Sequence, residues 1–212
     1  MEEFAKVLGL YDVVSYFIPG AIAVWAALEA FGTYCALHND GKHPRPISMP
    51  AFLFSAFVAG HLIQAVMSPL DDVVYRARGK DTVEKHYYKP EQQRFKVLLE
   101  EKMEAAFKGN SPEDMRALCE VYAQVRGLDT HTEKFLAYRG LFRGLALALL
   151  LSSFAFCYVY WSAKGRGKAI PRFLCIALLV GCLISIARWD RFNDYWLDSI
   201  YRTFYVNYSL LQ

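Results

Sequence analysis

The sequence lacks the motifs that mark most enzymes and most metal-binding proteins. It contains no HExxH, no GxSxG, no Walker loop and no dinucleotide-binding fingerprint. Its five cysteines are odd in number, unevenly spaced and free of any CxxC pair, which excludes a regular disulfide framework and favours buried reduced thiols. We therefore predict a protein that is not an enzyme and binds no cofactor or metal. A metal site at His38 and His43, which flank one loop, is the weaker alternative.

A strong charge imbalance is also missing. The 212 residues include 24 Lys and Arg against 21 Asp and Glu, a net charge of +3. So small an excess does not indicate a duplex-DNA binder, although local basic patches can still bind anions. Apolar residues make up 55% of the chain, which excludes a disordered or collagen-like protein.

Long apolar runs are abundant instead. Four stretches are near the ~20 residues that cross a bilayer, and they cover Tyr11–Leu37, Ala51–Met67, Leu141–Ala163 and Phe173–Ala187. The fourth is too short alone, so we expect its helix to continue through Arg188 into the C-terminal segment. The sequence predicts an all-α polytopic membrane protein with about four transmembrane helices, a helical cytoplasmic insert and a C-terminal amphipathic helix.

The chain divides into four segments. Residues 1–68 and 140–187 form two pairs of transmembrane helices, residues 69–139 form the helical insert, and residues 188–212 form the amphipathic helix. Pro19-Gly20 should bend the first span, and the second should end near Ser68-Pro69. A capping box at Thr130 predicts one helix that runs unbroken from the insert into span three.

Orientation rests on two signals of unequal strength. The bias of Lys and Arg toward one side of the spans is weak, and the loop Lys164–Lys168 opposes it. Cytoplasmic placement of the insert avoids moving about 70 residues across the membrane. We therefore expect both termini to be cytoplasmic.

Small residues recur every four positions along spans three and four. Close approach of helix backbones in lipid favours such spacing. Packing within one subunit and packing between subunits both explain it. The glycines that we assign to oligomer packing are Gly140, Gly144 and Gly181.

Basic residues interleave with aromatic ones in two places. Arginines pair with phosphates and aromatic rings stack on bases, so the pattern suits a nucleotide or single-stranded nucleic acid. An aromatic belt with positively charged anchors is the alternative. The candidate ligand-binding residues are Arg188, Arg191, Tyr195, Trp196 and Arg202 at the C-terminal end, with Arg76 and Arg78 after span two.

Polar residues in or beside the spans could line a pore. Asp190, Asp194 and Asp198 share one helix face, and in a symmetric oligomer they would form acidic rings that favour cations. A solvated face with nearby arginines as partners is the alternative. His61 and Gln64 lie near the middle of span two, where they either hydrogen-bond between helices or line a water-filled path.

The layout resembles a family of small membrane effectors in bacterial anti-phage defence, nearest to the channel subunit of the Hailong system. The residues that carry the resemblance are Phe17-Ile18-Pro19-Gly20, Gly60-His61 and the segment from Arg188 to Tyr205. The resemblance implies a homotetrameric ion channel of the bacterial inner membrane. It also implies that single-stranded DNA oligomers, made by a partner nucleotidyltransferase, hold the channel closed.

These observations predict an oligomeric, multi-pass membrane channel or pore-forming effector that an anionic (oligo)nucleotide ligand gates. Its partners would be membrane lipid, further copies of itself and the DNA oligomers. A non-conducting membrane anchor that recruits a cytoplasmic partner is the alternative, and an enzyme that acts on lipid is a distant third.

Overall fold

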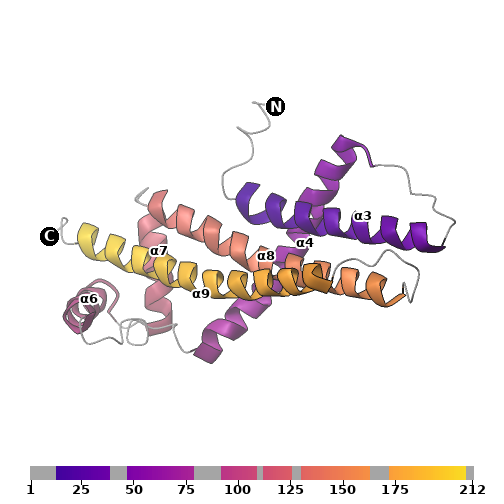
Figure 1. Ribbon diagram of the computed structural model, residues 1–212. Helices are drawn as coiled ribbons and strands as arrows, with labels where there is room; N and C mark the ends of the chain where they lie inside the picture. The colour runs from indigo at the N-terminus through magenta and orange to yellow at the C-terminus, as the bar shows by residue number, and fades with distance from the viewer. Residues whose placement is uncertain are drawn as a thin grey trace. The chain divides into compact units, whose positions relative to one another are not determined.

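The computed structural model describes residues 13–38, 47–78, 92–108, 112–125, 130–162 and 172–208. These residues form helices and no strand, which confirms the all-α class (Figure 1). The elements are η1 (Val13–Phe17), α3 (Ile18–His38), α4 (Met49–Arg78), α6 (Gln93–Ala106), α7 (Pro112–Val125), α8 (Thr130–Ser162) and α9 (Arg172–Tyr208).

Four helical stretches are long and apolar enough to cross a membrane, as expected for a polytopic membrane protein. They are Val13–Cys35, Met49–Leu70, Lys134–Val159 and Phe173–Tyr208. Large apolar side chains stay exposed along them, among them Phe54, Leu62 and Leu183 at 63–71%. Such exposure is costly in water and costs nothing against lipid tails.

Two long helices continue beyond the length that crosses a membrane, as expected. α8 runs for 33 residues from Thr130 through span three, and α9 runs for 37 residues from the fourth span to Tyr208. At ~1.5 Å per residue α9 is about 55 Å long, so it exceeds a ~30 Å hydrocarbon core. The arginine at position 188 lies inside this helix rather than at its end.

The second candidate span ends at Leu70, close to the expected Ser68-Pro69. Its helix is longer than the span, because α4 continues through Pro69 to Arg78. A proline removes one hydrogen bond from a helix and can kink it, but the remaining bonds can carry the helix onward. The irregularity of span one is a π-helical segment, Val13–Phe17, which ends two residues before Pro19.

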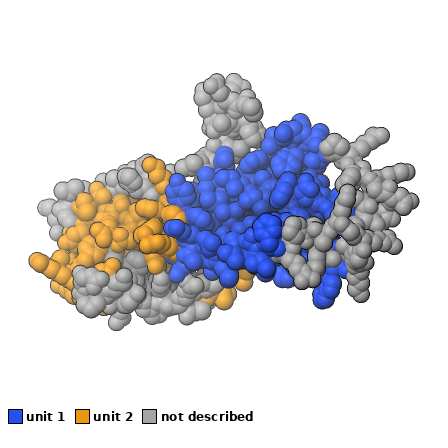
Figure 2. All heavy atoms as spheres, in the orientation of Figure 1, with its two compact units in different colours: residues 1–67, 137–190 blue, residues 68–136, 191–212 orange. Residues whose placement is uncertain are grey.

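The described chain divides into two compact units, coloured in Figure 2. Unit 1 comprises residues 1–67 and 137–190, and unit 2 comprises residues 68–136 and 191–212. The boundaries fall inside α4, α8 and α9, so each of these helices belongs to both units. In unit 1 an apolar cluster forms between α3, α8 and α9, with Ala26, Phe156 and Cys175 buried in it.

Unit 2 has its own core, which is rich in aromatic residues. α6 contributes Leu99 and Met103, and α7 contributes Cys119. The largest share comes from the second half of α9, whose buried members are Trp196, Leu197, Ile200, Tyr201 and Phe204. The C-terminal segment is therefore amphipathic, as expected, and its apolar face is covered by the insert.

Candidate functional site

A buried glutamine joins three helical elements of unit 1. Gln64, on α4, is 4% exposed. Its Nε2 donates hydrogen bonds to the carbonyl oxygens of Ser15 and Gly140, each at 2.7 Å. Its Oε1 accepts from Nε and Nη2 of Arg143, at 2.8 and 2.5 Å. Because an unpaired amide is costly away from water, this pairing lets a polar side chain fasten η1, α4 and α8 together.

Pro19 explains why the carbonyl of Ser15 needs this donor. In a regular α-helix that oxygen would accept from the N–H of residue 19, and proline has none. Gln64 supplies a donor in its place. The Ser15 hydroxyl, fully buried, donates in turn to the Ala137 carbonyl of α8 at 2.9 Å. The freed carbonyl of span one is thus satisfied by a side chain of α4, and span one in turn supplies a hydroxyl donor to α8.

Glycines let the backbones around this network approach closely. A Cβ at Gly20 would lie 1.8 Å from the Ala56 oxygen, and one at Gly60 would lie 1.9 Å from the Tyr16 oxygen. A Cβ at Gly144 would lie 2.7 Å from Pro19 Cγ and 2.8 Å from Gln64 Nε2. A Cβ at Gly20 or Gly60 would meet backbone atoms, so these two positions require glycine, whereas at Gly144 the atoms that would have to shift belong to side chains.

Two of the three glycines assigned to oligomer packing are occupied by contacts within the subunit. Gly140 and Gly144 are buried, and both contact Gln64. Gly181 is half-buried, and a Cβ there would lie 3.2 Å from Leu149 Cδ1 of α8. Within unit 1 the small residues therefore serve helix packing, and their role between subunits stays a prediction.

His61 lies outside the buried network although it is on the same helix as Gln64. Its side chain is exposed, and its ring stacks on Tyr16 at 4.3 Å between centroids and 15° between planes. Nδ1 lies 3.0 Å from the carbonyl oxygen of Phe57. His61 is within two residues of the middle of the span Met49–Leu70. An exposed polar ring at that depth fits a protein interface or a wet path better than lipid.

The second half of α9 carries two aromatic residues that were predicted to contact the ligand, and the structure buries one and exposes the other. Trp196 is 6% exposed and packs in the core of unit 2, whereas Tyr195 is 42% exposed. Tyr195 lies against Phe135 of α8 and Phe192 of α9, with ring centroids 5.8 and 5.9 Å away. Of the pair, Tyr195 is therefore the ring that a ligand can reach in this state.

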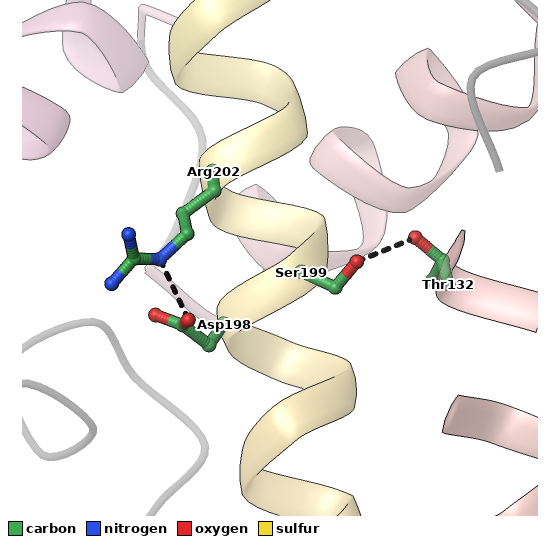
Figure 3. A network of polar contacts seen from close by, with 4 residues as sticks. All are labelled: Thr132, Asp198, Ser199 and Arg202. Carbon is green, nitrogen blue, oxygen red and sulfur yellow. Dashed lines mark hydrogen bonds and ion pairs between the residues drawn. The ribbon is translucent and has the colours of Figure 1, made fainter. Parts of the chain in front are cut away.

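Arg202 is a basic residue of this helix that contacts both an acidic and an aromatic side chain (Figure 3). Its Nε donates to Asp198 Oδ2 at 2.6 Å, and its side chain is 64% exposed. Its guanidinium carbon lies 5.6 Å from the centroid of the Phe95 ring on α6. An exposed ion pair of this kind is worth only ~0–1 kcal/mol. The pair agrees with the alternative in which the aspartates serve as partners for arginines.

Figure 3 also shows how this part of α9 is held. The hydroxyl groups of Ser199 and Thr132 lie 3.1 Å apart, which links α9 to the first turn of α8. On α6, Lys102 Nζ donates to the Tyr205 carbonyl at 3.1 Å and lies 3.8 Å from the centroid of the Tyr205 ring. Polar contacts from α6 and α8 therefore fix the orientation of the charged face of α9.

The other predicted residues fall into three groups. Arg191 is exposed, and its guanidinium carbon lies 5.9 Å from the Tyr195 ring centroid. Arg188 is exposed in the unit 1 part of α9, and Asp190 and Asp194 are half-buried. Arg76 and Arg78 belong to the last turns of α4, and their side chains lie outside the described residues, as do those of His38 and His43. The structure thus brings Arg191, Arg202 and Tyr195 onto one segment of one unit.

Sequence reasoning missed Ser15, Arg143 and Lys102. Arg143 had a usable signal, because a charged residue within the apolar run of span three marks a polar partner nearby. Ser15 could have been found from Pro19, which frees the carbonyl four residues earlier. Nothing in the spacing distinguished Lys102 from the other charged residues of its helix.

No metal site is evident in the described ranges. Among these residues, no three His, Cys, Asp or Glu side chains gather closely enough to hold an ion. The thiol of Cys119 on α7 is fully buried, and burial raises its pKa to about 12.

Comparison of the chain with protein-family models, curated proteins and solved structures found no match.

Proposed function

We propose that this chain is a subunit of an oligomeric membrane channel, or pore-forming effector, that an anionic (oligo)nucleotide ligand gates. The observation that carries the proposal is the continuity of α9, which supplies a membrane span to unit 1 and the central element of the core to unit 2. The resemblance to anti-phage membrane effectors supports a role in that defence. It also supports a homotetramer in the bacterial inner membrane. Cytoplasmic placement of the insert, which avoids moving about 70 residues across the membrane, favours cytoplasmic termini.

A shared helix offers a direct route for coupling. Residues 172–190 of α9 belong to unit 1, and residues 191–208 belong to unit 2. A ligand that binds the second part more tightly in one conformation shifts the equilibrium by its difference in affinity between the two. Because the helix is unbroken, a shift or rotation of the second part carries into the span.

The chemistry of unit 2 suits a phosphate-bearing ligand. Arg191 and Arg202 are both exposed, and each lies near an aromatic ring, Tyr195 or Phe95. Guanidinium groups bind phosphate oxygens through paired N–H donors, and aromatic rings stack on bases. A phosphate that binds Arg202 must displace the carboxylate of Asp198 from it. Breaking this exposed Arg202–Asp198 ion pair costs only ~0–1 kcal/mol.

In this proposal the pore is enclosed by the spans of several subunits. Of the four candidate spans, that of α9 is the least buried within the chain. Its exposed apolar side chains, such as Ile176 and Leu183, can pack against another copy or against lipid. The candidate pore-lining residues are His61 and Asp190 in unit 1, and Asp194 and Asp198 in unit 2. Gln64 binds three residues of its own subunit, so we assign it to holding the spans together.

A non-conducting anchor is the second candidate, and one observation favours it. Apolar side chains stay exposed on the two helices of the insert, with Val97 at 50%, Val121 at 52% and Val125 at 79%. Outside a membrane such a surface fits a partner protein. In that case α9 would hold the insert at the membrane without conducting ions.

Ion flux from liposomes tests the proposal. Purified protein is reconstituted into KCl-loaded vesicles, and flux is followed with and without a short, mixed-sequence single-stranded DNA. We expect flux that the DNA alters, and binding that weakens with salt. The double variant Arg191→Ala/Arg202→Ala should bind more weakly, with a flatter salt dependence. Arg94→Ala/Lys108→Ala is the matched control, since it removes two exposed charges from the same unit.

The outcomes separate the two candidates. Flux that DNA changes in wild type and control, but not in the double variant, supports the gated channel. Flux that DNA never changes supports a channel and removes the ligand from the proposal. An absence of flux under any condition, with the protein correctly assembled, favours the anchor.

A further inference from the structure

Two cysteines from the last two spans lie side by side near the connection between α8 and α9. Cys157 is exposed and stands five residues before the end of α8, while Cys175 is buried three residues after the start of α9. Their side chains lie close enough to interact with one another. Neither residue takes part in the buried glutamine network or in the charged face of α9.

The surrounding packing brings α8 and α9 together at this level, independently of that interaction. The Ser153 hydroxyl of α8 donates to the Cys175 carbonyl at 3.4 Å. Cys157 comes one helical turn after Ser153, so it lies on the same face of α8. Phe156 and Val159 of α8 share an apolar cluster with Cys175. The two helices are therefore in close contact at this level, and each contributes one thiol.

Both thiols also lie close to the ends of their membrane spans. Cys157 is two residues before the end of the span Lys134–Val159, and Cys175 is two residues after the start of the span that begins at Phe173. A water-soluble reagent can reach this level without entering the middle of the hydrocarbon core. The exposed thiol of Cys157 is the one it would meet first.

We propose that Cys157 and Cys175 form a reversible disulfide between α8 and α9, made by thiol–disulfide exchange with a disulfide-bearing oxidant. The Cys157 thiol loses its proton and attacks one sulfur of the oxidant, which breaks that S–S bond and releases one thiol. The Cys175 thiolate then attacks the Cys157 sulfur of the mixed disulfide. The Cys157–Cys175 bond forms, and the second thiol of the oxidant leaves with a proton. The two electrons lost by the cysteines reduce the oxidant.

This site is independent of the proposed channel activity. The bond would tie the end of α8 to the start of α9 and limit their relative movement. A membrane anchor with the same two helices would carry the same pair. The test therefore follows the sulfur atoms rather than ion flux.

Differential alkylation of the full-length protein tests the proposal. The protein in lipid nanodiscs is treated with oxidised glutathione, quenched with acid, denatured, and blocked with N-ethylmaleimide at neutral pH. It is then reduced, labelled with iodoacetamide and mapped by mass spectrometry. We expect Cys157 and Cys175 to take the second label together. Cys182, buried on the same helix, should take the first label after denaturation.

Single variants identify the order of the two steps. Cys175→Ser should accumulate the mixed disulfide of Cys157 with glutathione, and Cys157→Ser should leave Cys175 reduced. Alanine at each position repeats the experiment in case serine disturbs packing, and Cys182→Ser is the matched control that should behave as wild type. The proposal is wrong if wild-type Cys157 stays as a mixed disulfide beside a reduced Cys175, or if Cys157 pairs with Cys35.

Discussion

Replacement of Gln64 by leucine should destabilise the protein more than any exposed substitution on α4. The change removes two hydrogen bonds to backbone carbonyls and leaves the half-buried Arg143 without its amide acceptor. Two neutral bonds at ~1 kcal/mol each, and the two bonds from Arg143 taken together as one interaction with a charged group at ~1.5–3 kcal/mol, give about 3.5–5 kcal/mol. Hydrogen bonds between membrane helices average nearer ~0.6 kcal/mol, so we expect a loss of about 2–4 kcal/mol.

Reversible unfolding in bicelles measures this loss. Val66→Ala is the matched control, because Val66 is on the same helix and 57% exposed, and it should change stability by less than ~0.5 kcal/mol. Arg143→Leu combined with Gln64→Leu should cost less than the sum of the single changes, since the double variant leaves no guanidinium behind. Equal losses for Gln64→Leu and Val66→Ala, with additive single effects, would refute the argument that this network holds three elements together.

Two further predictions concern glycine packing and thiol reactivity. Gly60→Ala should destabilise unit 1 by ~1–3 kcal/mol or more, because the added Cβ meets the backbone oxygen of Tyr16. Gly32→Ala is the control, since nothing lies within 4 Å of a Cβ there. Thermal unfolding of both variants measures the difference. Cys119 should resist a maleimide pulse at pH 8 that labels Cys157, since burial raises the pKa of the Cys119 thiol from 9.0 to about 12. The raised pKa favours the folded state below pH 9, and this contribution is lost as the pH rises from 9 toward 12, so wild type should lose more stability over that range than Cys119→Ala. Rapid labelling of Cys119 in folded protein would contradict the buried core of unit 2.

The helices were predictable because apolar length and helix-start signals act locally. The capping box at Thr130 and the short fourth run both indicated helices that continue past the membrane, and α8 and α9 do so. The continuation of α4 through Pro69 was not predictable, since a proline leaves the choice between a kink and an end to its tertiary surroundings.

The candidate site was predictable only as a set of residue types. Spacing placed Trp196 and Tyr195 together among candidate ligands, but the fold of the insert over α9 buries one and exposes the other. Likewise, Gln64 was expected either to bond between helices or to line a path. Its partners are a serine carbonyl 49 positions away and an arginine 79 positions away, and no local pattern specifies such pairs.

The core of unit 2 joins segments that the ribosome makes at very different times. Cys119 and Phe204 pack in one cluster, yet 85 residues separate them. At ~5–20 residues per second the insert waits roughly 4–17 s for its partner helix. During that interval spans three and four must enter the bilayer while the apolar faces of α6 and α7 remain uncovered. Biogenesis therefore needs either a chaperone for the insert or a nascent chain that tolerates the delay. A truncation before residue 196 would make that exposed state permanent and mark the protein for proteolysis.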